Sequence, residues 1–217
     1  MDGMTQVLRY SLKETYKNIV AIVLLSVGVL TIVSPSFFLF PIPYALIYCG
    51  ILIGPLTIAA NYYIQKVLLN DKIKLIPTFF EAFKKFGVIG LLYSILFSLF
   101  IFIVVASWWQ WFGTREFFSF VIASFQTYFV GMILVSQIYT IPLIVKYQYS
   151  LKDSVLLSVK LLIKYPLYTL SAFLQLVSIF VLLLFTVVGV LFLYPGIFSM
   201  FTNIMTSNVM NDIESNK

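Results

Sequence analysis

The side chains that could do chemistry inside the long apolar stretches of this chain are uncharged amides. They are Asn61, Gln65, Gln126, Gln137, Gln175, Asn203 and Asn208. Carboxamides can line a polar path for a solute, but in membranes they more often hydrogen-bond between helices, at about 0.6 kcal/mol per bond. Asn61 and Asn203 are the best candidates for a polar intramembrane site, because each follows a break made by glycine and proline, and Gln137 is a further candidate.

The residue types that are missing limit the chemistry further. The chain has no histidine and a single cysteine, Cys49. The usual general base, the usual zinc ligand and the Ser-His and Cys-His nucleophile pairs are therefore missing, and neither an intramolecular disulfide nor a CxxC motif can form. We expect a protein that is not an enzyme and that has no cofactor and no metal site.

Composition points to lipid as the main solvent. Hydrophobic residues make up 61% of the 217 residues and charged residues 10%, whereas soluble domains carry about 25% charged residues. This predicts one integral membrane domain, residues 1–217. The net charge is +6, but the basic residues stand between apolar runs, which argues against nucleic-acid binding and is typical of contact with anionic lipid headgroups.

Runs without charged residues predict the architecture; they cover residues 18–65, 86–114, 117–145 and 165–211. A helix rises about 1.5 Å per residue and a hydrocarbon core is roughly 30 Å thick, so that each shorter run fits one span and each longer run fits two. Pro35, Pro41 and Pro43 favour a turn inside the first run. We expect an all-α polytopic membrane helix bundle with spans at about 18–38, 44–65, 86–108, 117–145, 165–186 and 189–210.

The last run allows a second interpretation. A turn near residues 186–190 gives six spans and leaves Pro195 and Gly196 as a kink in the sixth, whereas a turn at Pro195 itself gives five. Gly54 and Pro55 fall inside the second span, where proline removes a backbone hydrogen bond. Because a freed carbonyl is costly in lipid, we expect both breaks to face the bundle interior.

Lysine and arginine gather on one side of the expected spans. The loop between the third and fourth spans has only Arg115. The other basic residues near span ends are Arg9, Lys13, Lys17, Lys66, Lys72, Lys74, Lys84, Lys85, Lys146, Lys152, Lys160 and Lys164. The positive-inside rule therefore places the N-terminus and both lysine-rich islands in the cytoplasm. We also expect residues 20–33 to be a retained first span rather than a signal peptide, since no small-x-small cleavage site follows.

Each lysine-rich island predicts an interfacial amphipathic helix on the cytoplasmic side. Thr78 and Glu81 have the spacing of a capping box, and Ser150 and Asp153 repeat it. The expected helices cover residues 79–85 and 151–164. Their likeness indicates a parallel repeat of span, interfacial helix and span, as in many transporters, although any loop that re-enters a membrane needs a cap, lysines and an aromatic side chain.

A phenylalanine cluster in the first island is a candidate for docking a partner subunit. It consists of Phe79, Phe80, Phe83 and Phe86. The commoner role of such a stripe is to lie in the lipid interface with its neighbouring lysines at the headgroups.

Several segments together resemble a known family. Segments 54–57, 79–86, 141–142, 150–153 and 164–166 are similar to the YesL-like family of small bacterial integral membrane proteins of unknown function, and the resemblance covers roughly residues 18–208. It implies a multi-pass protein of the bacterial plasma membrane and an accessory role beside a carbohydrate uptake system of the ATP-binding-cassette type. It brings no catalytic residues.

Two functions follow as hypotheses. The first is a non-enzymatic membrane accessory protein that contacts the membrane subunits of a transporter, which is what the resemblance implies. The alternative is a small-solute transporter or channel, which the broken spans and the internal repeat favour.

Overall fold

The computed structural model describes residues 3–69 and 73–215 of the chain. Every regular element in these residues is a helix, as expected for a chain that must pair its backbone N–H and C=O groups within each segment that crosses lipid. The described helices are α1 (Met4–Lys17), α2 (Ile19–Leu39), α3 (Ile42–Leu68), α4 (Leu75–Thr114), α5 (Phe117–Ser136), α6 (Thr140–Tyr147), α7 (Leu151–Lys164), α8 (Pro166–Leu184) and α9 (Val187–Ser215).

Six helical segments in the described residues are long and apolar enough to cross a membrane: α2, α3, α4, α5 together with α6, α8 and α9. The all-α bundle with six spans is therefore confirmed, and the chain is a polytopic membrane protein. The five-span alternative is wrong, because α9 starts at Val187 and continues through Pro195. The turn between the last two spans thus lies well before Pro195.

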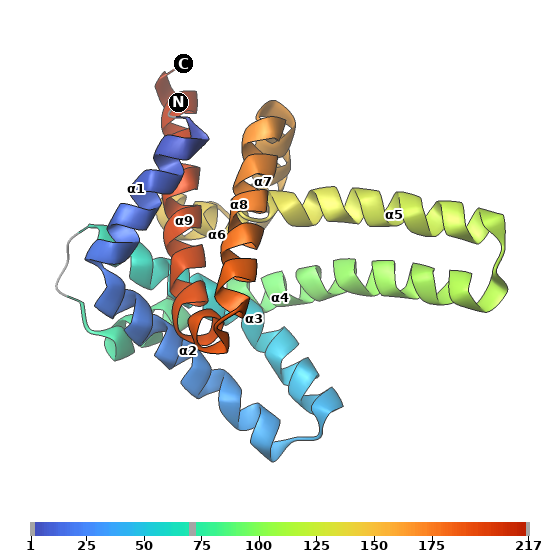
Figure 1. Cartoon of the computed structure of the whole chain (residues 1–217), viewed down its shortest axis with the longest axis horizontal. Coiled ribbons are helices and arrows are strands. Elements are labelled where there is room, and N and C mark those ends of the chain that lie inside the picture. The colour runs from blue at the N-terminus through green and yellow to red at the C-terminus, as the bar shows by residue number, and fades with distance from the viewer. Residues whose placement is uncertain (1–2, 70–72, 216–217) are drawn as a thin grey trace.

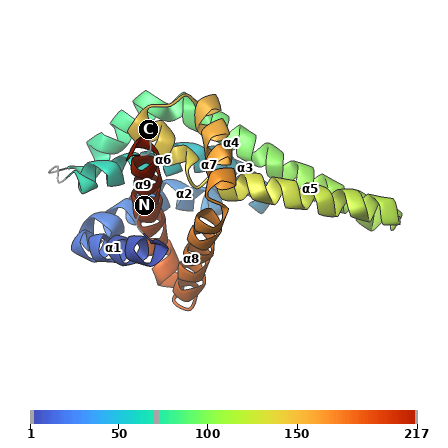
Figure 2. The same cartoon turned by 90° about the horizontal axis from the view of Figure 1, so that it is seen from above.

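The spans form three hairpins, α2–α3, α4–α5 and α8–α9, which spread from a common centre (Figure 1). The turns of α2–α3 and α8–α9 lie opposite the end of the molecule that carries both termini and α7, whereas the α4–α5 turn lies to one side. Seen from above, the α4–α5 hairpin leaves the other helices and extends to one side (Figure 2). We call the end with the termini and α7 the termini side, and the opposite end the hairpin side.

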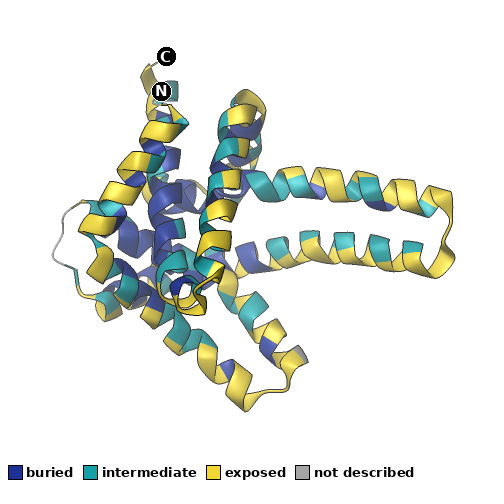
Figure 3. Cartoon of the chain, in the orientation of Figure 1, coloured by how far each residue is buried: buried dark blue, intermediate teal, exposed yellow. Residues whose placement is uncertain are grey.

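Buried residues concentrate where α3, α6 and α9 meet (Figure 3). The short helix α6 lies in this region, and its side chains from Thr140 to Val145 are all buried. The sequence pattern did not predict α1, an amphipathic helix that buries Val7, Ser11 and Thr15 and packs mainly on α9. The core thus lies toward the termini side, and the hairpins diverge from it.

Helices α3 and α4 cross in close contact at Gly54 and Gly90. A Cβ atom on Gly90 would lie 2.8 Å from the Cα of Pro55, and one on Gly54 would collide with the Gly90 carbonyl oxygen. Gly50 and Gly54 on α3, and Gly90 and Ser94 on α4, are small residues spaced four apart, the pattern that lets membrane helices approach closely. This spacing is visible in the sequence but was not among the predicted features.

Pro55 has no N–H, so it leaves the carbonyl of Ile51, one turn earlier, without its helical donor. The Ser94 hydroxyl takes this place: it donates to the Ile51 carbonyl oxygen at 2.8 Å and accepts from the Gly54 N–H at 2.8 Å. Gly54 and Pro55 are buried. The proline therefore faces the bundle interior, and α3 continues past it as one helix.

The fourth span predicted over residues 117–145 is present as Phe117–Tyr147, but it is made of two helices instead of one. The interruption falls between α5 and α6. Pro142 stands in the first turn of α6, a position that tolerates a missing N–H, and the chain turns just before it. The Gln137 side chain replaces part of the lost hydrogen bonding, since its Nε2 donates to the Ile133 carbonyl oxygen at 3.2 Å.

The second predicted interfacial helix is present as α7, a separate helix with the predicted bounds. Its cap forms as expected at the backbone, because the Ser150 hydroxyl accepts from the Asp153 N–H at 3.2 Å. The carboxylate of Asp153 in turn accepts from the Ser150 hydroxyl at 2.6 Å. This pairing fixes the start of α7 directly after the central helix α6.

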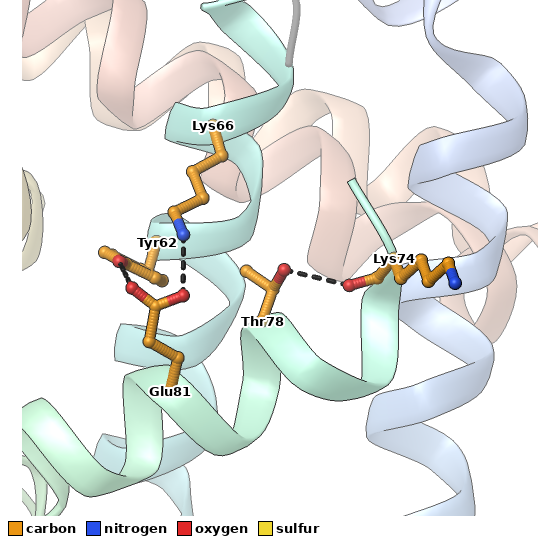
Figure 4. Close-up of polar contacts among 5 residues, drawn as sticks. All are labelled: Tyr62, Lys66, Lys74, Thr78 and Glu81. Atoms are coloured by element: carbon orange, nitrogen blue, oxygen red, sulfur yellow. Dashed lines mark hydrogen bonds and ion pairs between the residues drawn. The ribbon is translucent and has the colours of Figure 1, made fainter. Parts of the chain in front are cut away.

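The first predicted interfacial helix is the beginning of α4 and not a separate element, because α4 runs unbroken into the third span. The capping box at Thr78 is wrong. Thr78 lies inside α4, and its hydroxyl donates back to the Lys74 carbonyl oxygen at 2.8 Å (Figure 4). The two halves of the expected repeat therefore enter their next span differently, one through a continuous helix and one through a break at Tyr165.

Cysteine labelling tests the orientation of this fold. In a Cys49→Ser background, we expect Lys74→Cys and Lys152→Cys to react with a membrane-impermeant maleimide only from the cytoplasm, and Gly113→Cys only from outside, because the lysine asymmetry sets the topology. All three positions are exposed. Reaction of Gly113→Cys from the cytoplasmic side would show that the orientation is the opposite of the predicted one.

The close helix crossing predicts a contrast between two glycines of α4. Gly90→Ala should destabilise the protein by about 1–3 kcal/mol, because the added methyl group overpacks the contact with Pro55. Gly87→Ala has open space around its new Cβ and should be neutral or slightly stabilising, since alanine is the better helix former. Unfolding of the purified protein in detergent measures both; equal effects would contradict the close crossing.

Candidate functional site

Asn61 of α3 and Asn203 of α9 lie in direct contact in the buried centre. The Asn203 Nδ2 donates to the Asn61 Oδ1 at 2.8 Å, and the two residues are only 2% and 0% exposed, respectively. We call these two residues the amide pair. The fold thus brings together the two amides that the sequence singled out, from spans that are distant along the chain.

Neighbouring hydroxyl and carbonyl groups enclose the amide pair. Thr202 Oγ1 lies 3.2 Å from Asn61 Oδ1, and Asn61 Nδ2 donates to the Thr57 carbonyl oxygen at 2.9 Å. Asn203 Nδ2 also donates to the Ser199 carbonyl oxygen at 2.8 Å. Apart from Asn203 Oδ1, which is buried without a partner in the described residues, the amide groups bond within the protein. This geometry is that of an interhelical joint.

The proline and glycine of α9 set its approach to α2. A Cβ on Gly196 would lie 2.6 Å from the Cγ2 of Ile22 and 3.1 Å from the Ile22 carbonyl oxygen, so that only glycine fits this contact. The Ser199 hydroxyl donates to the Pro195 carbonyl oxygen at 2.9 Å. With α9 held against α2 at this level, its following turns bring the amide of Asn203 to α3.

A cavity of about 470 Å³ opens between α2, α3 and α9, beside the amide pair. Its wall includes Val33, Cys49, Ile53, Leu56, Pro195 and Phe198. Thr57 and Ser199 also reach it, but their hydroxyls donate to backbone carbonyls of their own helices. An apolar wall suits an apolar group such as a lipid chain, whereas a sugar or an ion would lose its hydrogen bonds to water there.

Gln137 belongs to a second polar cluster, at the turn between α5 and α6. Its Oε1 accepts from the Thr140 hydroxyl at 2.8 Å, and Thr140 Oγ1 lies 3.1 Å from Ser158 Oγ on α7. Gln137 Nε2 lies 3.1 Å from Ser136 Oγ. Gln137 therefore joins the turn to α7, and the three amides predicted from the sequence do not form one site.

The Glu81 carboxylate links the beginning of α4 to the C-terminal part of α3. Figure 4 shows it between Tyr62 and Lys66: the tyrosine hydroxyl donates to one carboxylate oxygen, and the Lys66 Nζ lies 2.6 Å from the other. Exposed ion pairs contribute at most about 1 kcal/mol. The bridge therefore serves mainly to hold the first turns of α4 against α3, a role that replaces the capping role predicted for Glu81.

The phenylalanine cluster considered for partner docking packs mostly inside the chain. Phe79 and Phe86 are buried, and the Phe86 ring lies 5.8 Å from the Tyr62 ring, centroid to centroid. Phe83 is partly buried against the same core. Phe80 alone among the four is well exposed, at 73%. The cluster thus anchors α4 to α3 and leaves one ring for lipid or a partner.

Comparison with known proteins gave no match: no family model, curated protein or solved structure is significantly similar to the chain. Among the described residues, no group of three or more His, Cys, Asp or Glu side chains lies close enough to hold a metal ion. The features that a functional proposal must start from are the amide pair, the apolar cavity and the open hairpins.

The amide pair predicts coupled effects of mutation. Asn61→Leu and Asn203→Leu should each destabilise the protein, because each leaves the other amide buried with fewer partners. The double variant should cost less than the sum, with a coupling free energy of about 0.6 kcal/mol and at most roughly 1.7 kcal/mol. Unfolding in detergent measures the cycle, with the exposed Gln110→Leu as the control for removing an amide; additive effects would show that the amides do not interact.

Proposed function

We propose that this membrane protein is a non-enzymatic accessory protein that packs against the membrane helices of a larger complex. The observation that carries the proposal is the uncovered α4–α5 hairpin. No residue from 95 to 122 is buried, and Figure 3 shows exposed and partly exposed residues along the whole projecting part. Another membrane protein has room to pack on either side of it.

The hairpin is held together by its own side chains. Trp108 Nε1 donates to Thr127 Oγ1 at 2.8 Å, and Ser107 is hydrogen-bonded to Gln126. The Trp108 and Trp111 rings meet edge to face, with centroids 5.3 Å apart. Polar groups are therefore paired between the two helices, while large apolar side chains point outward. Such a preformed unit can pack against other helices without rearranging.

The resemblance to the YesL-like family supports the choice of partner. Members of that family often accompany carbohydrate uptake systems of the ATP-binding-cassette type, and we propose the membrane subunits of such a system as the partner, in a bacterial plasma membrane. The amide pair supports the same choice over a solute path, because its groups bond to one another and to the backbone.

The alternative function, a small-solute transporter or channel, is supported by the cavity between α2, α3 and α9. It lies beside Pro195, at a helix position where a backbone carbonyl lacks its usual donor, and next to the amide pair. Its apolar wall favours a solute that is itself apolar. The carbohydrate expected from the resemblance would therefore be the cargo of the partner and not of this chain.

Affinity purification tests the accessory role. Full-length tagged protein, extracted from its native membrane in mild detergent, should retain membrane subunits of an ATP-binding-cassette uptake system, identified by mass spectrometry. Phe102→Ala with Phe125→Ala, which removes two exposed rings from the hairpin, should lower the retained amount at least several-fold, because large side chains dominate interface energies.

The control for this experiment is Phe37→Ala with Phe38→Ala, which removes two exposed rings from the α2–α3 hairpin instead. It should leave retention unchanged. A preparation that contains no such subunits, together with solute flux after reconstitution in liposomes that is lost in Asn61→Leu with Asn203→Leu, would contradict the accessory role and favour the transporter.

A further inference from the structure

A pocket of about 350 Å³ lies at the termini side, where α1 covers the ends of α3, α6 and α9. Its polar lining includes Gln6, Tyr10, Lys146, Ser207 and Asn211. It differs from the apolar cavity between α2, α3 and α9 in two respects: polar side chains share its wall with apolar ones, and it stands where the spans end. Neither the amide pair nor the α4–α5 hairpin takes part in it.

Lys146 is the charged residue in the lining of this pocket. Its Nζ lies 2.6 Å from the Ser207 Oγ and 5.4 Å from the centroid of the Tyr147 ring. Within the described residues it forms no ion pair, whereas Lys66 contacts the Glu81 carboxylate directly. The Glu214 carboxylate acts on this charge from beyond ion-pair contact, so that an external anion can still contact the ammonium directly.

Further hydrogen-bond donors line the same pocket as the Lys146 ammonium group. The side-chain amides of Gln6 and Asn211 and the hydroxyl of Tyr10 line the same pocket, and all three residues are exposed. An ammonium group with several neutral donors around it is the pattern that suits the several oxygens of a phosphate group. We infer that this pocket binds a phosphate-bearing anion, with Lys146 as its charged contact.

The surroundings fit the phosphate of an anionic phospholipid. Val7, Leu68 and Ile204 add apolar surface to the pocket, which the glycerol backbone and the upper part of an acyl chain can cover. Because Lys146 directly follows the charge-free run 117–145, we expect the pocket to lie near the headgroups. The lysine distribution assigns the termini side to the cytoplasm, where anionic lipids give the membrane surface a negative potential.

Lipid titration of the purified full-length protein in a neutral detergent tests the inference. Native mass spectrometry and thermal stability should both report binding of short-chain phosphatidylglycerol in preference to short-chain phosphatidylcholine. Lys146→Gln should weaken this binding about tenfold, the order expected for losing one charge-assisted hydrogen bond. Lys152→Gln, which removes an exposed lysine from α7 outside the pocket, is the matched control and should change the affinity less than about twofold, as surface charges contribute little.

Two further exposed positions keep the test decisive if Lys146→Gln does not fold. Asn211→Ala and Gln6→Ala each remove a neutral donor from the pocket and should weaken binding severalfold. Equal losses in the Lys146 and Lys152 variants would show general attraction of lipid to a basic surface and would overturn the inference, as would unchanged binding in all pocket variants.

A second titration, with soluble phosphates, distinguishes a lipid headgroup from a soluble phosphate ester as the ligand. Glycerol 3-phosphate and inorganic phosphate are titrated against the same variants. Binding of phosphatidylglycerol alone, sensitive to Lys146→Gln, assigns the pocket to a lipid headgroup, and equally sensitive binding of glycerol 3-phosphate assigns it to a soluble phosphate ester. Binding of neither overturns the inference. None of these outcomes depends on whether the chain has an accessory role.

Discussion

The backbone carbonyl of Ile51, which Pro55 leaves without a donor in the middle of a membrane helix, is the constraint on which the arrangement of the spans depends. A lone carbonyl in lipid costs several kcal/mol, so a donor must come from elsewhere. The Ser94 hydroxyl supplies it, at 2.8 Å. That bond requires α4 to approach α3 within reach of a short side chain, which is possible only because Gly54 and Gly90 have no Cβ there.

The same helix, α3, is also joined to α9 by the amide pair, where Asn61 receives the amide of Asn203. The C-terminal part of α3 is joined to the beginning of α4 by Glu81, which contacts both Tyr62 and Lys66. These polar contacts join α3 to α4 and α9 at different points along its length. α3 is therefore the axis of the bundle, although it is neither the longest nor the most apolar of the spans.

The features that depend on the lipid surroundings, or on residues close together in the chain, were predicted from the sequence. Charge-free runs long enough to cross a bilayer located the six spans, because a continuous apolar run of that length pairs its backbone in lipid as a helix. The cap at Ser150 depends only on residues a turn apart. Features set by tertiary contacts were not predicted. The break at Gln137 depends on hydrogen bonding to Thr140 of α6, which also bonds Ser158 of α7. Thr78 has the spacing of a cap but lies inside α4, because the helix starts earlier, at Leu75. The Gly54–Gly90 crossing is a tertiary contact that does leave a pattern in the sequence, because its small residues are spaced four apart.

The molecule thus divides into a fixed half and an adaptable half. Toward the termini side, α1, α6, α7 and the ends of the spans bury residues of every polarity, and hydrogen bonds specify one arrangement there. Toward the hairpin side the spans separate, and no residue from 95 to 122 is buried. Interior packing and directional hydrogen bonds resist rearrangement, whereas a surface of exposed apolar side chains can exchange lipid for protein with little change in its own structure. The proposed membrane partner is therefore expected to contact the α4–α5 hairpin, while the termini side keeps the fold and the proposed phosphate pocket in place.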